Sequence, residues 1–389
     1  MGYPRIYLAI DNCFASKRWT DPDDWAKIIA ESGLRFVESS ADTECDMLYS
    51  DADYLAAWRQ KIKENCERYH MQVPCAYTGH GTYATLGLTH LDARCRDRML
   101  TKWMYPHIDN AAAFGQIAGF FCHAFDDTVL QDPKTYDTFL NILYDQMTAI
   151  AVYAGEKGVL PSLEQMYSPQ QYPWRIADAE DIVRKASRPG APLYITVDTG
   201  HQYGQQRFLK PTREDIVKAI ANGTELYVGP ACCYEILSEA REGKRSPEEA
   251  ADRILSCLES YPFLFAEASD SDTYLWLKRL GKYAPIVHLQ QTDNTASAHK
   301  DFSEKNNVSG IVSGEKVLRT LHECFSEPDD PTMPPPVDAI YLTLELFYSN
   351  AEKSDNIRRS IAESVRYWRQ FIPEDGLTLD DLVNRLEKN

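Results

Sequence analysis

The sequence predicts an α/β chain folded as a (β/α)8 barrel, the TIM barrel fold, and three observations support this. Short apolar runs occur eight times, most are followed by a longer stretch with helical spacing, and the runs are continuously apolar. Strands buried on both faces have this continuous apolar character, and alternating strands and helices favour a parallel sheet. Eight such units are typical of a closed barrel.

The elements follow in order along the chain. The expected strands cover residues 6–11, 36–39, 72–77, 119–124, 159–166, 193–198, 285–290 and 339–346. The expected helices cover residues 22–32, 51–69, 93–114, 136–157, 177–186, 314–324 and 355–370, with a short last helix at 377–386. The first helix begins with Pro-Asp-Asp, which is favourable because carboxylates are stabilised at the positive end of a helix.

The connection between the sixth and seventh strands is unusually long. It covers residues 199–284 and contains amphipathic stretches such as 246–260. A normal strand-helix-strand unit needs about half of this length. We therefore expect one domain over residues 1–389, with residues 203–282 as a helical elaboration inserted between strands six and seven.

Composition and charge narrow the class of protein. The 389 residues include 41 Lys and Arg against 58 Asp and Glu, a formal net charge of −17. Such an acidic chain repels nucleic acids and anionic lipids. The N-terminus lacks the pattern of a signal peptide, no apolar run is long enough to span a membrane, and the ten cysteines form no C-x-x-C pair. We expect a cytoplasmic protein whose cysteines are reduced core residues.

Polar side chains stand at or just beyond the carboxyl ends of most of the expected strands. In a barrel these ends face a common pocket. Acids and imidazoles in apolar runs are costly to bury unless they are paired, protonated or bound to a metal. The residues in these positions are Glu38, His80, His123, Glu164, Asp198, His201, His288, Gln290 and Glu345.

Four of these residues form a candidate metal-binding set: Glu164, Asp198, His288 and Glu345. Three carboxylates and one imidazole suit Mn²⁺, Mg²⁺, Co²⁺ or Zn²⁺, with coordination positions left for substrate oxygens. The alternative is a structural network, which is disfavoured because burying three acids without a cation is expensive. The inference depends on the barrel, since the spacings are too long for a local motif.

The same residues carry a resemblance to a known family. Glu164 lies in LEQMY, Asp198 and His201 in DTGH, His288 in VHLQQTD and Glu345 in LTLEL. With these motifs the chain resembles the xylose-isomerase-like TIM barrel superfamily, which includes sugar epimerases, sugar isomerases and endonuclease IV. The resemblance covers most of residues 6–370 outside the insertion.

The ketose 3-epimerase branch of that superfamily implies roles for these residues. The four matching residues would bind one divalent ion, with Mn²⁺ expected first. Glu164 and Glu345 would be the catalytic acid/base pair on opposite faces of the substrate, and the ion would stabilise a cis-enediolate. His201 would contact a substrate hydroxyl or carbonyl oxygen. One departure is that Asn294 or a neighbour stands where such epimerases place an arginine.

Further residues are candidates for substrate binding: His123, His80, Gln290, Trp174 and His299. His80 and His123 could instead be core imidazoles bonded to the backbone, and Trp174 could merely cap the barrel. His299 lies on an expected loop, HLQQTDNTASAHKDF, which resembles a sub-branch acting on sugar phosphates but could simply be solvated. Glu38 could pair with Arg35, and His70, His90, His107 and His322 are expected on the surface or on helices.

The leading hypothesis is an isomerase of carbohydrate metabolism: a metal-dependent sugar or sugar-phosphate epimerase, or an aldose-ketose isomerase, acting by proton abstraction next to a carbonyl. The alternatives are a metal-dependent lyase or decarboxylase on an oxidised (3-oxo) sugar or sugar acid, and a non-catalytic sugar-binding barrel. Endonuclease chemistry is disfavoured because it needs more histidine ligands and a basic groove. The expected partner is a small carbohydrate or sugar phosphate, without nucleic acid or membrane, and a homo-oligomer is left open.

Overall fold

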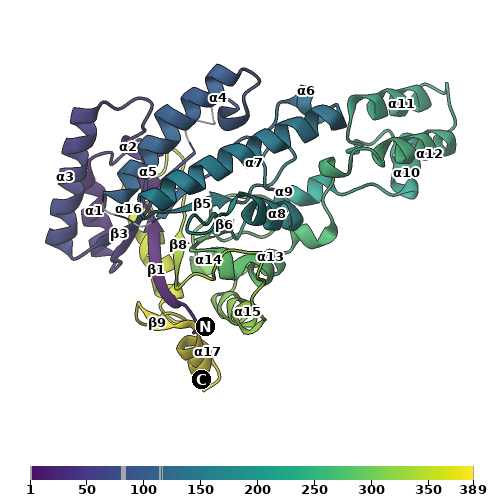
Figure 1. Ribbon diagram of the computed structural model, residues 1–389. Coiled ribbons are helices and arrows are strands. Elements are labelled where there is room, and N and C mark those ends of the chain that lie inside the picture. Colours follow the sequence, from purple (N-terminus) through teal and green to yellow (C-terminus); the bar gives the residue numbers. More distant parts are fainter. Residues whose placement is uncertain (1, 80–84, 114, 116, 389) are drawn as a thin grey trace.

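Eight parallel strands form a closed barrel in the computed structural model, which describes residues 2–79, 85–113, 115 and 117–388 (Figure 1). Each strand pairs with the next along the chain, and β1 pairs with both β8 and β2, which closes the ring. The predicted (β/α)8 barrel is therefore confirmed. The strands are β1 (Arg5–Asp11), β2 (Phe36–Ser40), β3 (Gln72–Thr78), β4 (Ile117–Phe120), β5 (Leu160–Glu164), β6 (Tyr194–Asp198), β7 (Ile286–Leu289) and β8 (Ala339–Leu344).

Helices surround the strands (Figure 1). The longer ones are α1 (Pro22–Glu31), α3 (Ala52–Tyr69), α4 (Ala93–Met99), which continues through η4 (Leu100–Met104) into α5 (Tyr105–Ala112), α7 (Pro133–Glu156), α8 (Ile176–Ala186), α13 (Thr273–Leu280), α15 (Gly314–Ser326), α16 (Ser354–Trp368) and α17 (Leu379–Leu386). The short ones are η1 (Asn12–Ala15), α2 (Ala41–Glu44), η3 (Gly87–Thr89), α6 (Asp127–Leu130), α9 (Gln202–Gln205), η5 (Gln206–Phe208), η6 (Pro262–Leu264), η7 (Ala268–Ser271), η8 (Gly281–Tyr283) and α14 (Glu304–Asn307).

Local sequence explains where the main helices begin. An aspartate precedes α1, α3 and α7, and in each case its carboxylate accepts a hydrogen bond from a backbone N–H of the first turn. Helices α1 and α7 also have proline at their first position, where its missing N–H costs no hydrogen bond. These residues determine where the helices begin and thereby the path of the chain to the next strand.

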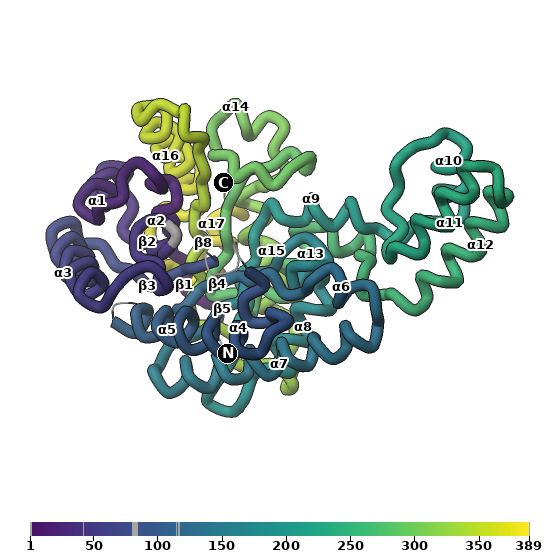
Figure 2. The backbone as a smooth tube through the Cα atoms, turned by 90° about the horizontal axis from the view of Figure 1, so that it is seen from above, coloured from purple at the N-terminus to yellow at the C-terminus, as the bar shows by residue number. Residues whose placement is uncertain are grey.

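The connection between β6 and β7 contains a group of helices that extends beyond the barrel. Figure 2 shows α10 (Arg213–Asn222), α11 (Ala231–Arg241) and α12 (Pro247–Leu258) grouped at one side of the molecule. Helix α10 packs on α12, and α11 packs on α12. Gly223, in the left-handed conformation with φ 64°, ends α10, and Ser246 accepts a hydrogen bond from the Glu249 N–H at the start of α12.

The observed elements differ from the predicted ones mainly at strand ends. Strand β4 ends at Phe120, although the apolar run continues to Ala124, because Ala124 and Phe125 donate to the Gln170 carbonyl instead of to a neighbouring strand. Strand β8 ends one residue before Glu345. A short strand that was not predicted, β9 (Leu377–Thr378), pairs antiparallel with β1. No helix among the described residues is long and apolar enough to cross a membrane.

The expectation that the cysteines are core residues is only partly right. Six of the ten are buried, and no disulfide joins any of them within the described residues. Cys232 is exposed, and Cys66, Cys95 and Cys257 are partly exposed. Cys232 and Cys257 lie on helices outside the barrel, where one face of each helix meets solvent.

Candidate active site

The carboxyl ends of the strands bring the predicted polar residues together. Glu164 and Asp198 are the last residues of β5 and β6, His288 lies in β7, and Glu345 directly follows β8. Asp198 and His288 stand side by side in the register of β6 and β7. All four are buried, and one ligand atom from each lies within 4.8 Å of the others. The structure therefore brings the four predicted metal ligands into one cluster.

The His288 imidazole lies at the centre of this cluster. Its Nδ1 is 3.0 Å from Glu164 Oε1 and 3.4 Å from Glu345 Oε2, and its Nε2 is 2.8 Å from Glu38 Oε1. Burial alone would lower the pKa of His288, but the carboxylates of Glu345, Glu38 and Glu164 raise it well above its usual value. The geometry places three acids around one imidazole.

Several carboxyl groups lie close together in this buried cluster. Burial, Glu38 and Glu345 raise the pKa of Asp11, the last residue of β1, well above its usual value. Burial also raises the pKa of Glu345 well above its usual value, against the opposing effect of His288. Both shifts mean that the ionised carboxylates are destabilised unless additional positive charge is present.

Asp198 is held in one orientation by its neighbours. Its Oδ1 accepts from the N–H groups of Gly200 and His201, at 2.6 and 3.0 Å, and the Gln290 amide donates to both carboxylate oxygens. Burial alone would raise the pKa of Asp198, but nearby imidazoles, that of His201 first, and the Gln290 amide lower it to about 2. A Cβ atom on Gly200 would lie 2.4 Å from Gln290 Cδ, which explains the glycine in DTGH.

The four residues fit a divalent cation. Metal–oxygen bonds of about 2.1 Å place opposite ligands about 4.2 Å apart, which agrees with ligand atoms within 4.8 Å of one another. Glu345 Oε2 is buried and accepts none of the described hydrogen bonds, although it lies 3.3 Å from His299 Nε2 and 3.4 Å from His288 Nδ1. An acceptor left without a donor is what a cation would satisfy.

The comparisons with known proteins agree with the observed fold. The sequence profile of the xylose isomerase-like TIM barrel family matches residues 26–324, which is more than half of the chain. The chain belongs to that family.

Solved structures share the fold of this xylose isomerase-like barrel. A protein of Rhodospirillum rubrum ATCC 11170, provisionally named xylose isomerase, superposes with a TM-score of 0.67 at 16% identity, covering 94% of this chain and 99% of that one. D-Psicose 3-epimerase from Clostridium cellulolyticum H10, with D-tagatose, gives a TM-score of 0.56 at 11% identity, covering 94% and 98%. At these identities the likeness concerns the fold.

A curated relative is also similar over a shorter stretch. D-erythrulose 1-phosphate 3-epimerase from Brucella abortus (strain 2308) is 27% identical over 108 residues, which are 28% of this chain. The match spans 31% of the length of that epimerase.

Two further residues contact the cluster of this xylose isomerase-like barrel. The Tyr77 hydroxyl, on β3, donates a hydrogen bond to Glu164 Oε2. Burial and the Glu164 carboxylate raise the pKa of Tyr77 well above its usual value, so the phenol keeps the proton it donates. His201 is buried, and its Nδ1 lies 2.9 Å from the Gln165 carbonyl and 3.8 Å from Glu164 Oε1. His201 thus stands at the edge of the cluster, and its contact with substrate stays a prediction.

The other predicted substrate-binding residues have different surroundings. His299 reaches the cluster, as described, from the loop after β7. The amide of Gln290 is occupied by protein groups, because it donates to Asp198 and accepts from the His299 N–H at 2.8 Å. These bonds favour a positioning role for Gln290 over the expected substrate contact. His80 lies outside the described residues.

Neither His123 nor Trp174 contacts the cluster through any of the described hydrogen bonds or ion pairs. His123 is half-buried beside Phe121, with ring centroids 6.2 Å apart. The Trp174 ring is buried against Phe208, and its carbonyl accepts from Gln205. The surroundings of Trp174 are those of a residue that caps the barrel, which was the alternative given for it from the sequence. Substrate contact stays a prediction for both His123 and Trp174.

The structure places two further residues of the sequence analysis. Glu38 bonds to His288 and not to Arg35, the possible partner suggested by the sequence, because residues three apart along a strand are separated by about 10 Å. His107 was expected on the surface or on a helix, and it lies on α5, where it is completely buried with its Nε2 3.1 Å from the Gly119 carbonyl.

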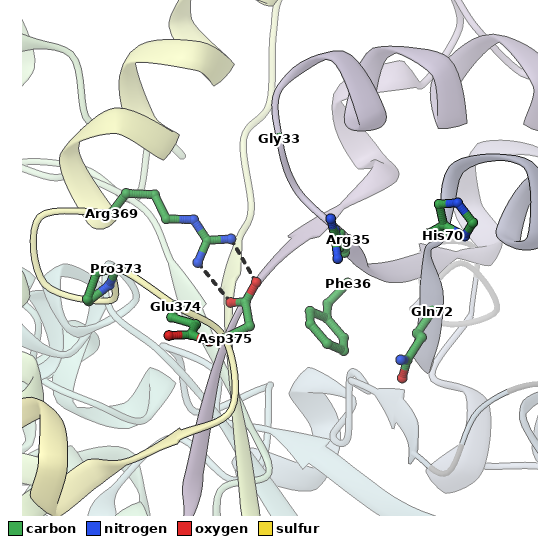
Figure 3. Close-up of a pocket in the computed structure, with 9 residues that line it drawn as sticks. All are labelled: Gly33, Arg35, Phe36, His70, Gln72, Arg369, Pro373, Glu374 and Asp375. Atoms are coloured by element: carbon green, nitrogen blue, oxygen red, sulfur yellow. Dashed lines mark hydrogen bonds and ion pairs between the residues drawn. The ribbon is translucent and has the colours of Figure 1, made fainter.

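A pocket of about 480 Å³ lies at the opposite end of the barrel (Figure 3). Phe36 and Gln72, the first residues of β2 and β3, line it, and Arg369 in its wall forms an ion pair of 2.8 Å with Asp375. The amino-terminal end of such a barrel contributes mainly to stability. The Arg369 pair is consistent with that role, since Asp375 also accepts from the Leu8 N–H of β1.

Three residues near the cluster were missed or misread in the sequence. Asp11 ends the first apolar run, just as Asp198 ends the sixth, so the strand-end rule could have identified it. Glu38 was found by that rule, but its contact with His288 was not predicted. Tyr77 gave no signal, because a tyrosine at the end of a strand is ordinary in a barrel core.

Proposed function

We propose that this protein is a divalent-metal-dependent epimerase or isomerase of a ketose or ketose phosphate, acting by proton transfer at the carbon next to a carbonyl. The observation that carries the proposal is the convergence of Glu164 and Glu345 with Asp198 and His288 in one buried cluster. The family and the epimerases among its structural neighbours support the same reaction class.

The two glutamates supply the acid/base pair. Glu164 and Glu345 both reach the His288 Nδ1, at 3.0 and 3.4 Å, but they come from β5 and from the end of β8, on different sides of the barrel mouth. One carboxylate would take the proton from the carbon next to the carbonyl, and the other would return a proton from the opposite face. The configuration at that carbon is thereby inverted.

The residues around the two glutamates position them for proton transfer. The Tyr77 hydroxyl binds one Glu164 oxygen and leaves the other facing His288. His299 and His201 lie at the edge of the cluster, where their imidazoles can bind substrate hydroxyl groups. Burial of the whole group strengthens the electrostatic interactions among its charged side chains.

Glu164, Asp198, His288 and Glu345 would hold the metal ion, for which Mn²⁺ is our first choice ahead of Mg²⁺, Co²⁺ and Zn²⁺. When bound, the ion supplies Lewis-acid stabilisation of the negative charge that develops on the substrate oxygens. The donor set of three carboxylates and one imidazole suits such hard to borderline cations.

The substrate is proposed to be a small carbohydrate. The Brucella relative is an epimerase of a tetrulose phosphate, and two of the neighbours are epimerases of free ketoses. The loop that carries Ser297 and His299 offers polar groups beside Glu345, where a phosphate or a terminal hydroxyl could bind. Both classes of substrate therefore belong in the test.

The test is proton exchange with solvent. The metal-loaded protein is incubated in D₂O with a panel of ketoses and of tetrulose and pentulose phosphates, and the products are analysed by NMR. We expect deuterium at the carbon next to the carbonyl, together with the epimer or isomer. Release of CO₂ or cleavage of the carbon chain would assign the lyase reaction instead, and binding without any exchange would assign a sugar-binding barrel.

Variants connect the reaction to the residues. Glu164→Gln and Glu345→Gln should each reduce turnover by about 100-fold or more, since each removes one partner of the acid/base pair. Glu248→Gln on the exposed surface of α12 is the matched control and should keep full activity. Turnover retained in either active-site variant would remove that glutamate from the pair.

A further inference from the structure

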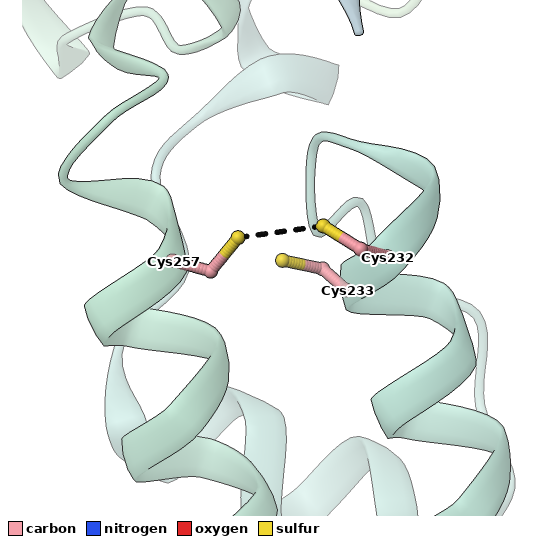
Figure 4. Close-up of side chains that lie close together, drawn as sticks. All are labelled: Cys232, Cys233 and Cys257. Carbon is pink, nitrogen blue, oxygen red and sulfur yellow. Dashed lines mark hydrogen bonds between the residues drawn. The ribbon is translucent and has the colours of Figure 1, made fainter. Parts of the chain in front are cut away.

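Three cysteines from two helices of the insertion meet outside the barrel (Figure 4). Cys232 and Cys233 lie in the first turn of α11, and Cys257 lies in the last turn of α12. The packing of α11 on α12 brings their sulfur atoms within 4.8 Å of one another, and Cys232 Sγ is 3.4 Å from Cys257 Sγ. Cysteines that are scattered in the sequence thus form a cluster in the fold.

The sulfur separations match those of thiolates that share one metal ion. Metal–sulfur bonds of about 2.3 Å place two sulfurs about 3.8 to 4.0 Å apart in tetrahedral or trigonal coordination. A disulfide requires about 2.05 Å, much shorter than the 3.4 Å between Cys232 and Cys257. The observed range lies around the value for shared coordination.

The surroundings of the cluster allow an ion to enter and stay. Cys233 is buried, Cys257 is partly exposed and Cys232 is exposed, so solvent reaches the cluster from the side of Cys232. Cys232 and Cys233 also lie at the positive end of the α11 dipole, which favours thiolates. A water molecule could supply a fourth ligand from the open side.

Without a cation, the three sulfurs interact only weakly with one another. Three thiols in contact offer weak donors and weak acceptors, and they gain little from being gathered. A cation that replaces their protons would turn this contact into three strong bonds.

We propose that Cys232, Cys233 and Cys257 form a second metal site, separate from the barrel centre, which binds one thiophilic d10 cation, Zn²⁺ or Cu⁺, through three thiolate sulfurs. Thiolates select these soft or borderline ions, whereas the oxygen-rich barrel centre suits harder ones. On binding, three S–H bonds break, three metal–sulfur bonds form and three protons pass to solvent, with no change of oxidation state.

The ion would join the start of α11 to the end of α12. Both helices belong to the group that stands beside the barrel in Figure 2, and none of the residues of the barrel centre lies on them. The role that follows is structural: the ion would resist separation of the two helices. Because the reaction centre uses other residues, this site is independent of the proposed catalytic function.

The experiment titrates the full-length, reduced protein with Zn²⁺ and, in a separate anaerobic arm, with Cu⁺. Asp198→Asn is used as the background, so that binding at the barrel centre is suppressed. Bound metal is counted by elemental analysis after dialysis, and Co²⁺ serves as a spectroscopic probe for thiolate-to-metal charge transfer. We expect one ion per chain, a charge-transfer band with Co²⁺, and affinity that falls as the pH is lowered because protons compete for the sulfurs.

Serine variants identify the ligands. Cys257→Ser and Cys232→Ser should each weaken binding by about 100-fold or more, since loss of an outer partner alone commonly costs 10- to 100-fold. Cys232 is exposed, so its variant retains the fold even if a variant at buried Cys233 does not. Cys95 is partly exposed and lies outside the cluster, so Cys95→Ser is the matched control. Its metal affinity should equal that of the parent.

Three results would overturn the proposal. The first is unchanged metal affinity and charge transfer in Cys257→Ser and Cys232→Ser. The second is the absence of stoichiometric Zn²⁺ or Cu⁺ in the Asp198→Asn protein. The third is a disulfide between two of the three cysteines in protein prepared with metal present, which would assign a redox link instead.

Discussion

At the scale of single residues, the candidate active site is organised around one imidazole and one amide. His288 contacts Glu38, Glu164 and Glu345, and so gathers acids from three strands. Gln290 performs a similar task for Asp198, to which its amide donates at 2.8 and 3.0 Å. The carboxylate of a proposed metal ligand is thereby held in one orientation.

Replacing Gln290 by alanine tests this positioning role. The change removes both hydrogen bonds to Asp198 and the acceptor for the His299 N–H. We expect the affinity for Mn²⁺ to fall by about 10- to 100-fold, while turnover at saturating metal changes less. Isothermal titration measures the affinity.

Ser297→Ala provides the control, because the Ser297 hydroxyl contacts the Gln290 amide but makes none of the described hydrogen bonds to Asp198. Its metal affinity should remain close to that of the parent. Equal losses in the two variants would show that the loop, rather than the Asp198 contact, determines affinity.

Tyr77→Phe tests the hydrogen bond to Glu164. A hydrogen bond to a charged group contributes about 1.5 to 3 kcal/mol, so its loss should lower kcat by about 10- to 100-fold with little effect on metal binding. Tyr341→Phe, whose ring stacks on Tyr7, is the matched control and should be neutral. A normal kcat in Tyr77→Phe would show that Glu164 does not depend on this bond.

At the scale of elements, strand ends could be predicted and loop contacts could not. Continuous apolar runs locate buried strands, and parallel strands in a barrel necessarily bring their carboxyl ends together, so Glu164, Asp198 and His288 were found from sequence. The contact between Glu38 and His288 was not found from sequence. The choice between Arg35 and His288 as the partner of Glu38 depends on which end of the strand each side chain occupies. The contact between α11 and α12 depends on tertiary packing, so the cysteine cluster had no local signal.

His107 provides a test of stability at this scale. It is buried on α5, and burial lowers its pKa from 6.5 to about 4. Because the folded state disfavours the charged imidazole, His107 contributes full stability above pH 6.5, and this contribution is lost as the pH falls from about 6.5 to about 4. The difference between these two pKa values corresponds to roughly 3 kcal/mol.

His107→Gln keeps a donor for the Gly119 carbonyl and removes the titration. The free energy of unfolding, measured in urea at several pH values, should fall less steeply in the variant than in the parent between pH 6.5 and 4. His322→Gln is the control, since His322 is partly exposed and paired with Asp380 at 3.0 Å. Parallel pH profiles for parent and His107→Gln would contradict this explanation.

At the scale of the whole molecule, acidic side chains are concentrated at the end of the barrel that carries the candidate active site. The chain has a formal net charge of −17, and five of its carboxylates gather at the carboxyl ends of the strands: Asp11, Glu38, Glu164, Asp198 and Glu345. Their mutual repulsion opposes folding, since like charges in a buried site destabilise the ionised forms. A cation that binds there opposes this repulsion, so metal binding and folding should be linked.

This linkage makes the stability of the protein depend on metal concentration. A ligand that binds only the folded state adds about 2.7 kcal/mol to the free energy of unfolding when its free concentration is 100 times Kd. We expect Mn²⁺ to produce such an increase in urea unfolding experiments and EDTA to reverse it. Asp198→Asn should abolish the increase, whereas Cys257→Ser should retain it, because Mn²⁺ prefers oxygen and nitrogen ligands over thiolates. An equal increase in parent and Asp198→Asn would mean that the stabilising ion binds outside the barrel centre.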